Sequence, residues 1–164
     1  MFDALSTLLS EVFSPSISVF LISMMPIAEL RGAIPIGVTL GLTPMNAAII
    51  AIIGNSIIVP ILLLIITPLF TRFKKLKAFR GFFTRYEERA ARKIGHYREY
   101  RLIGLFLLVA IPLPMTGAYT GCVAAVITKI SFKRAAPAII AGVMTAGCIV
   151  YFLTDIVHTT WFVH

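Results

Sequence analysis

Long apolar stretches constrain the fold of this sequence more than any other feature. Its hydrophobic residues fall into three blocks, at residues 16–70, 102–127 and 135–154, which are longer than the core elements of soluble domains. Charged residues make up only 13% of the chain, against about 25% in ordinary soluble domains. So few charges cannot cover the surface of a small soluble domain. We therefore expect an integral membrane protein.

Positive charge is concentrated in one segment. Eleven of the fifteen Lys and Arg residues lie within residues 72–101, opposed by three Glu residues, so this segment carries the whole net charge of +8. Its apolar residues recur every three or four positions, which predicts a basic amphipathic helix lying on anionic lipid headgroups or capping the transmembrane part. Because Lys and Arg accumulate on the cytoplasmic side, we expect this segment in the cytoplasm, beside a prokaryotic plasma membrane. No nucleic-acid partner is expected.

The chain resembles itself at an offset of 88 residues. This offset aligns Pro26 with Pro114, Ala47–Ala48 with Ala135–Ala136, and Gly54 with Gly142. In both copies a hydrophobic stretch broken by Pro and Gly precedes a long apolar helix, which is the pattern of transporters built from paired repeats. The fold class expected is an all-α membrane protein with an inverted repeat. Each half consists of a re-entrant helical hairpin plus one transmembrane helix.

This organisation gives a single membrane domain over residues 1–164. Its parts are an interfacial helix at 1–15, repeat 1 at 16–70, a basic amphipathic linker at 71–101, repeat 2 at 102–155 and a tail at 156–164. The broken segments 16–41 and 102–127 are the predicted hairpins, and 43–70 and 135–154 are the predicted crossings. Fourteen of the fifteen basic residues then lie in the cytoplasm. The alternative, four full spans, would export Lys129, Lys133 and Arg134.

Glu29 and Arg31 are the only charged side chains within the apolar blocks. Charges at membrane depth are costly, so each marks a candidate functional site. Their spacing of two residues does not let them face each other on a helix, which suits a break between half-helices. One interpretation is that Arg31 receives an anionic group while Glu29 exchanges a proton. The other is a buried ion pair that fixes the hairpin.

Helix ends near the two breaks extend this candidate site. A half-helix over Gly32–Gly41 would begin just after Arg31, and a second would begin at Thr116 or Gly117, with Thr116 as a candidate N-cap. Two helix N-termini that converge near mid-membrane suit a phosphate or a carboxylate. Asn55 is either a ligand or a contact between helices. The predicted substrate-binding residues are Glu29, Arg31, Gly32, Asn55, Thr116, Gly117, Tyr119 and Thr120.

The residue patterns of enzymes and metal sites do not occur in the sequence. It has no Ser/His/Asp or Cys/His set, no carboxylate pair in an apolar block and no P-loop. Cys122 and Cys148 lie inside apolar blocks without the spacing of a metal site or a disulfide framework. We expect no catalytic activity, no cofactor and no metal, and protons are the coupling species considered.

Two motifs resemble a known family. The runs ELRGAIPIG at Glu29–Gly37 and IPLPMTGAYTG at Ile111–Gly121 resemble the signature segments of the small multidrug export protein family, and the resemblance spans about residues 15–155. That family is similar to the DedA (SNARE-associated, VTT-domain) superfamily. The resemblance to DedA implies inverted re-entrant repeats and proton-linked carriers of polyprenyl phosphate or scramblases of phospholipid. DedA proteins carry arginines in the second motif, whereas Ala110–Gly121 has none.

Three functions follow as hypotheses. The first is a transporter that binds an anionic amphiphile, a polyprenyl phosphate or a phospholipid, between the hairpins, because Arg31 and the positive helix ends favour an anion. The alternatives are a proton-driven exporter of small cationic drugs and a membrane scaffold that transports nothing. Besides the lipid bilayer, the expected partner is a second copy in a homodimer or higher homo-oligomer. Small residues at Ala138, Gly142 and Ala146 offer a face for close approach.

Overall fold

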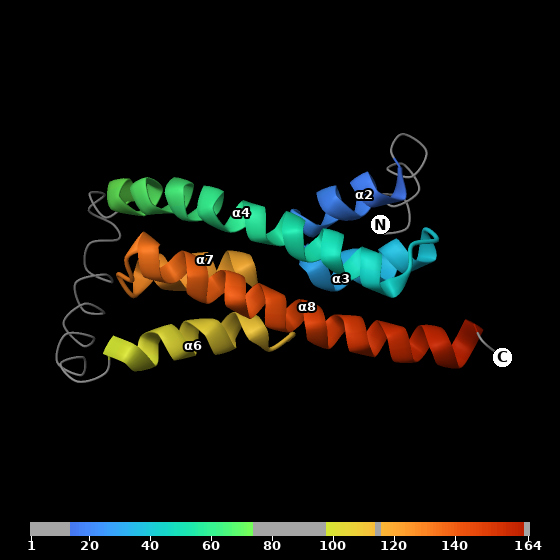
Figure 1. Ribbon diagram of the computed structural model, residues 1–164. Helices are drawn as coiled ribbons and strands as arrows, with labels where there is room; N and C mark the ends of the chain where they lie inside the picture. The colour runs from blue at the N-terminus through green and yellow to red at the C-terminus, as the bar shows by residue number, and fades with distance from the viewer. Residues whose placement is uncertain (1–13, 74–97, 114–115, 163–164) are drawn as a thin grey trace.

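The computed structural model describes residues 14–73, 98–113 and 116–162 (Figure 1). Within these ranges the chain is all-helical, as predicted, and contains no strand. Its helices are α2 (Pro15–Ser23), α3 (Glu29–Thr39), α4 (Pro44–Phe73), α6 (Arg98–Ala110), α7 (Ala118–Ile127) and α8 (Phe132–Phe162). The predicted interfacial helix at 1–15 and most of the linker at 71–101 lie outside the described residues.

Two of the helices are long and apolar enough to cross a membrane. They contain the candidate spans Pro44–Phe70 in α4 and Phe132–Thr160 in α8. At about 1.5 Å per residue, each helix rises about 45 Å, which exceeds a hydrocarbon core of about 30 Å. The helix α8 passes Thr154, the predicted end of its span, because Ile156 and Val157 continue the apolar sequence. The hydroxyls of Thr159 and Thr160 donate to the carbonyls four residues earlier.

Four short helices form two pairs, one in each half of the chain. Helices α2 and α3 lie at one end of the long helices, and α6 and α7 lie at the other end (Figure 1). The described parts of the two connections, residues 24–28, 111–113 and 116–117, lie in the middle part of the molecule (Figure 1). None of the four helices has the roughly 20 residues that a full crossing requires.

Proline accounts for the two breaks, and glycine allows the turn after α3. Pro26 and Pro112 lack a backbone N–H and fix φ, so neither connection continues as a regular helix. Pro35 lies inside α3, Pro60 and Pro68 lie inside α4, and Pro137 lies inside α8, and these helices continue through them. After α3 the chain turns at Gly41, which has a φ of +89°. Residues other than glycine rarely adopt that backbone conformation.

The second helix of each pair packs on the long helices of both halves. Helix α3 contacts α4 and α8, and α7 likewise contacts α4 and α8. Small residues allow the close approach: Gly54 of α4 lies against Phe20 of α2, and Gly142 of α8 lies against Phe106 and Val109 of α6. The predicted close-packing face of α8 is thus occupied within the subunit. Gly142 and Ala146 are buried and are unavailable to a second copy.

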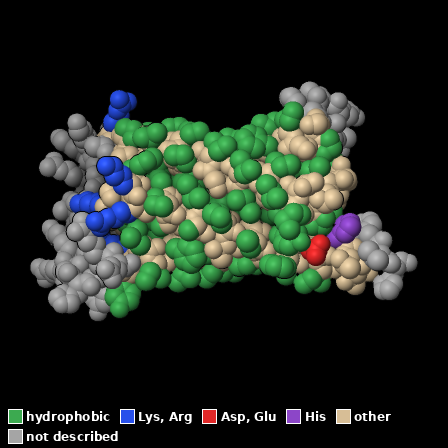
Figure 2. All heavy atoms as spheres, in the orientation of Figure 1, with side chains coloured by type: hydrophobic (Ala, Val, Ile, Leu, Met, Phe, Trp, Pro, Cys, Tyr) green, Lys and Arg blue, Asp and Glu red, His purple; other side chains and the backbone are tan. Residues whose placement is uncertain are grey.

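The surface suits a lipid environment. A broad apolar belt separates a cluster of Lys and Arg at one end from acidic and His residues at the other (Figure 2). On α4, exposed Ile49, Ile53, Ile57 and Ile61 repeat every four residues and form a stripe that no described element covers. An apolar stripe of this length is unusual on a soluble monomer and is ordinary on a lipid-facing helix.

Candidate functional site

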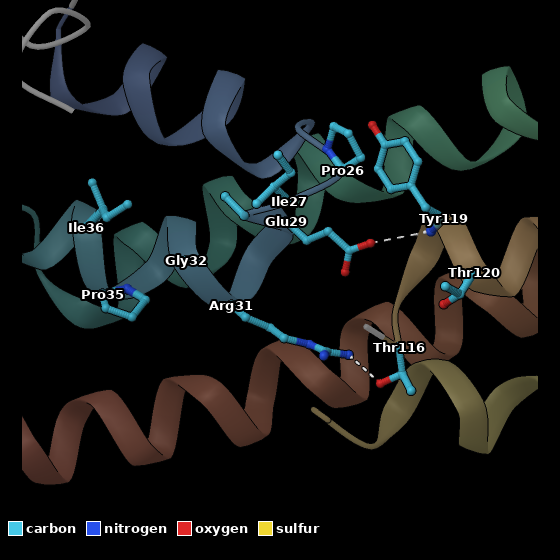
Figure 3. A pocket seen from close by; sticks show the side chains of 11 residues that line it. Pro26, Ile27, Glu29, Arg31, Gly32, Pro35, Ile36, Thr116, Tyr119 and Thr120 are labelled. Atoms are coloured by element: carbon cyan, nitrogen blue, oxygen red, sulfur yellow. Dashed lines mark hydrogen bonds between the residues drawn. The ribbon is translucent and has the colours of Figure 1, made fainter. Parts of the chain in front are cut away.

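A cavity of about 740 Å³ lies where the two helix pairs meet, midway along the molecule. Most of its wall is apolar, and the polar groups are few and close together (Figure 3). Its lining residues are Pro26, Ile27, Ala28, Glu29, Arg31, Gly32, Pro35, Ile36, Thr116, Tyr119 and Thr120. Its size and composition are those of a small-molecule site.

Arg31 reaches from α3 to the end of α6. Its Nη1 donates to the carbonyl of Leu113, and its Nη2 donates to the Thr116 hydroxyl at 3.1 Å and to the carbonyl of Ile111 at 3.4 Å. These carbonyls follow the C-terminal end of α6, where the helix dipole is negative. A guanidinium has five N–H donors, so three are used here. The Nε–H is buried and has no acceptor among the described residues.

Glu29 reaches in the other direction, to the beginning of α7. Its carboxylate accepts a hydrogen bond from the N–H of Tyr119 at 3.4 Å, and only 7% of the residue is exposed. A carboxylate at this position is stabilised by the positive end of the helix dipole. Glu29 and Arg31 point to different elements (Figure 3), and no ion pair joins them in the part of the chain that is described. The buried ion pair considered from the sequence is not formed.

The beginning of α7 differs from the prediction. Gly117, and not Thr116, is the N-cap, and it forms no side-chain cap. The Thr116 hydroxyl instead donates toward the carbonyls of Leu113 and Ile111, and it accepts from Arg31. Gly117 has a φ of +152°, and a Cβ added there would overlap the Glu29 carboxylate. Only glycine therefore allows the carboxylate to take the place of a cap.

The two helix pairs hold each other reciprocally. Arg31 and Tyr119 are 88 residues apart, and each donates to carbonyls at the end of the first helix of the other pair. The Tyr119 hydroxyl donates to the carbonyl of Met24, just after α2, as Arg31 does to Leu113, just after α6. Backbone carbonyls freed by the breaks are thus satisfied by side chains from the opposite half.

The beginning of α3 was predicted three residues too late. The helix starts at Glu29 and not at Gly32, because the N–H of Gly32 already donates to the carbonyl of Ala28 at 2.9 Å. The N–H groups of Leu30 and Arg31 donate to no backbone carbonyl among the described residues. The first turn of α3 contributes Glu29, Arg31 and Gly32 to the lining, so the positive end of this helix lies at the cavity.

Asn55 lies in the middle of α4 behind this site. It is 1% exposed, and neither its Nδ2 nor its Oδ1 has a partner among the described residues. It shares a narrow space with Glu29, Arg31 and Gly117. The structure therefore shows no hydrogen bond by which Asn55 would join two helices.

The structure brings all eight predicted residues to one region. Six of them line the cavity. Gly117 and Asn55 do not line it, but they border the narrow space that they share with Glu29 and Arg31. The sequence reasoning missed the apolar wall formed by Pro26, Ile27, Pro35 and Ile36. In the sequence, Pro26 precedes the charged pair Glu29 and Arg31, and Pro35 follows it. This position beside the charged pair was the one feature of the sequence that could have indicated the apolar wall.

The fold and the site define a class: a small integral membrane protein, all-helical in its described residues, in which two broken helical segments border a mostly apolar cavity with a few polar groups. The profile of the family described as "Putative small multi-drug export protein" matches residues 29–149. The chain belongs to this family, as the two motifs predicted. Searches of the curated proteins and of the solved structures each found no significant match.

Proposed function

We propose that the protein is a membrane transporter of DedA-like type, in which two inverted re-entrant hairpins carry an amphiphile at mid-membrane. Equivalent residues support the repeat: α3 and α7 end at Thr39 and Ile127, 88 residues apart, and α4 and α8 begin at Pro44 and Phe132, also 88 apart. The short helices of each pair lie at one end of the molecule and opposite pairs lie at opposite ends (Figure 1), as inverted hairpins require.

The proposed orientation places the basic end in the cytoplasm. Arg72 near the end of α4, Arg101 in the first part of α6, Lys129 just after α7, and Lys133 and Arg134 in the first turn of α8 belong to this end, and Asp155 lies on the far part of α8. Figure 2 shows the basic side chains gathered at one end of the apolar belt. This distribution follows the positive-inside rule for two crossings joined by a cytoplasmic linker.

The proposed substrate is an anionic amphiphile. The observation that carries this proposal is that Arg31, a partly exposed cation at the positive end of α3, lines a mostly apolar cavity beside the hydroxyls of Thr116 and Thr120. Arg31 is partly exposed, whereas Glu29 is buried and already bound to α7. An anionic headgroup binds to the donors, and the apolar wall receives the adjoining part of a chain.

Glu29 provides the coupling to protons. Ionised, it holds the beginning of α7, and protonation removes the charge that the helix end attracts. The side chain is then free to leave α7, and Asn55, which shares the space behind it, offers both a donor and an acceptor. The contact between Glu29 and the beginning of α7 thus has two states, formed and released. Substrate and proton are coupled because each favours a different one of these states.

A cationic drug is the second candidate substrate. It is favoured by the family description, which refers to multidrug export, and by the presence of a carboxylate at the cavity. In this alternative Glu29 would exchange a proton for the drug, and Arg31 would serve only to hold α6.

We also propose a homodimer or a higher homo-oligomer. Ile27 is 75% exposed at one break, and Ile111 and Leu113 are about half exposed at the other. Irregular backbone is tolerated at membrane depth only where protein or a water-filled cavity covers it. A second copy over the breaks would supply this cover. Native mass spectrometry in mild detergent should show dimers or larger species, and monomers alone would contradict the proposal.

Transport in proteoliposomes tests the function. Flip of a fluorescent lipid phosphate is measured beside ethidium efflux for the wild type, Arg31→Ala and Arg31→Lys. The anion carrier predicts lipid flip that Arg31→Ala abolishes and that Arg31→Lys, which keeps the charge, retains in part. If Arg31→Ala flips the lipid phosphate at the normal rate, or if the wild type moves only ethidium, the anion carrier is wrong and the drug exporter takes its place. Movement of neither by the wild type supports the scaffold.

A further inference from the structure

A second pocket, of about 350 Å³, lies at the basic end of the molecule, far from the central cavity. It is formed where the C-terminal parts of α4 and α7 meet the loop before α8. Its walls include apolar Leu63, Phe70, Val126 and Phe132, and its polar lining includes Lys129 and Ser131. The pocket therefore combines apolar walls with a basic residue, as expected at the boundary between an apolar belt and a charged end.

The backbone of Lys129 has an unusual conformation. Its φ is +56°, in the left-handed region, and the hydrogen bonds Lys129 N–H to Val126 at 3.2 Å and Ile130 N–H to Ala125 at 2.9 Å close the end of α7. Glycine usually occupies this position because it has no Cβ. A lysine there is strained, and strain of this kind is common at functional positions.

The first half of the chain provides the comparison. Gly41, 88 residues before Lys129, closes α3 with the same pair of hydrogen bonds and a φ of +89°. One half therefore uses the unstrained residue at this turn, and the other half places a lysine beside a pocket. The turn itself does not require a lysine, as Gly41 shows.

Other cations lie close to Lys129 in the structure or in the sequence. Arg101 donates to the carbonyl of Thr128 at 3.1 Å, directly beside Lys129, and Lys133 and Arg134 follow on α8. Among the side chains that the structure describes, the carboxylates are Glu29, at the central cavity, and Asp155, near the opposite end of α8. Neither of these two carboxylates lies beside the pocket.

We propose that this pocket binds the headgroup of an anionic phospholipid of the surrounding bilayer. Lys129 contacts the phosphate, and the apolar walls receive the first part of an acyl chain. The apolar walls and the position at the edge of the belt favour a lipid over a soluble phosphate. The site is separate from the transported substrate: its occupation stabilises the junction of α4, α7 and α8, whether or not the central cavity carries an anion.

The test uses Lys129→Gly and Lys129→Asn, because both residues tolerate the left-handed conformation. The full-length protein is heated in neutral detergent with phosphatidylglycerol, with phosphatidylcholine, or with soluble glycerol phosphate. The wild type should unfold at a higher temperature with phosphatidylglycerol only. Both variants keep the left-handed turn, and each should lose most of the lipid-induced shift relative to its own unfolding temperature without lipid.

Lys133→Gln is the matched control, because it removes one charge from the same end without lining the pocket. It should keep most of the shift. An equal loss in Lys133→Gln and in the two Lys129 variants would show diffuse attraction instead of a site and would overturn the proposal. A full shift in either Lys129 variant, or an equal shift with glycerol phosphate, would also overturn it. None of these outcomes depends on which substrate the transporter carries.

Discussion

Glu29 and Gly117 occupy equivalent positions 88 residues apart, and they meet at the centre of the molecule. Both have a positive φ, +47° and +152°. At one position the chain has a carboxylate, and at the other it has no side chain, so the carboxylate fills the space that a Cβ would need. The charged site thus depends on the two halves having different residues at this equivalent position, a glutamate in the first half and a glycine in the second.

Gly117→Ala should be strongly destabilising. The added Cβ overlaps Glu29 and the backbone conformation is strained, so we expect a loss of about 2 kcal/mol or more in the free energy of unfolding. Thermal unfolding in detergent measures this loss. Gly104→Ala is the control, because a Cβ in α6 would meet nothing within 4 Å. It should be neutral or slightly stabilising, and equal losses in both variants would refute the Glu29–Gly117 contact.

Asn55→Val should separate stability from transport. Both polar atoms of Asn55 are buried without partners among the described residues, which costs about 1–3 kcal/mol. Valine, the residue at the equivalent position 143, should therefore raise the unfolding temperature. Transport should fall, because protonated Glu29 would lose the partner that the proposed mechanism gives it when it leaves α7. Transport at the wild-type rate by the more stable variant would remove Asn55 from the mechanism.

At the scale of the elements, the sequence was informative about where helices break and less so about where they begin. Proline at Pro26 and Pro112 locates the breaks because its chemistry is local. The start of α3 and the cap of α7 depend on contacts with the opposite half, which no local pattern contains. Thr116 has the composition of an N-cap, but Glu29 from another helix takes that role, and Arg31 engages the threonine.

Tyr119→Phe should weaken the contact between the two helix pairs. It removes the hydrogen bond to the carbonyl of Met24, so the free energy of unfolding should fall by about 1 kcal/mol. Tyr151→Phe in α8, whose ring contacts Phe152, is the control and should leave the unfolding temperature unchanged. Equal unfolding temperatures for Tyr119→Phe and the wild type would show that the hydroxyl contributes nothing to the contact.

At the scale of the whole molecule, composition and charge were sufficient to predict an all-helical membrane protein with two long spans. The small face of α8 was assigned wrongly to a partner subunit, because Gly142 packs on α6 within the chain. Sequence periodicity identifies a close-packing face, but it does not identify the helix that fills it.

Cysteine labelling in intact cells should establish the orientation. In a background without Cys122 and Cys148, a cysteine at position 159 should react with an impermeant reagent, and one at position 133 should react only after lysis. Lys133 and Thr159, the residues to be replaced, are both exposed and lie at opposite ends of α8. Labelling of position 133 from outside would overturn the orientation, while reaction of both positions before lysis would be inconsistent with a sealed crossing by α8.

The most direct measurement of the central claim, that the substrate lies between the two helix pairs, is protection of a cavity residue during transport. Thr120→Cys lines the cavity, and Val123→Cys, on the same helix, is exposed outside it. In the same cysteine-free background, a transported lipid phosphate should slow modification of position 120 severalfold and leave position 123 unchanged. Equal modification of position 120 with and without saturating substrate, in protein that transports, would contradict the claim.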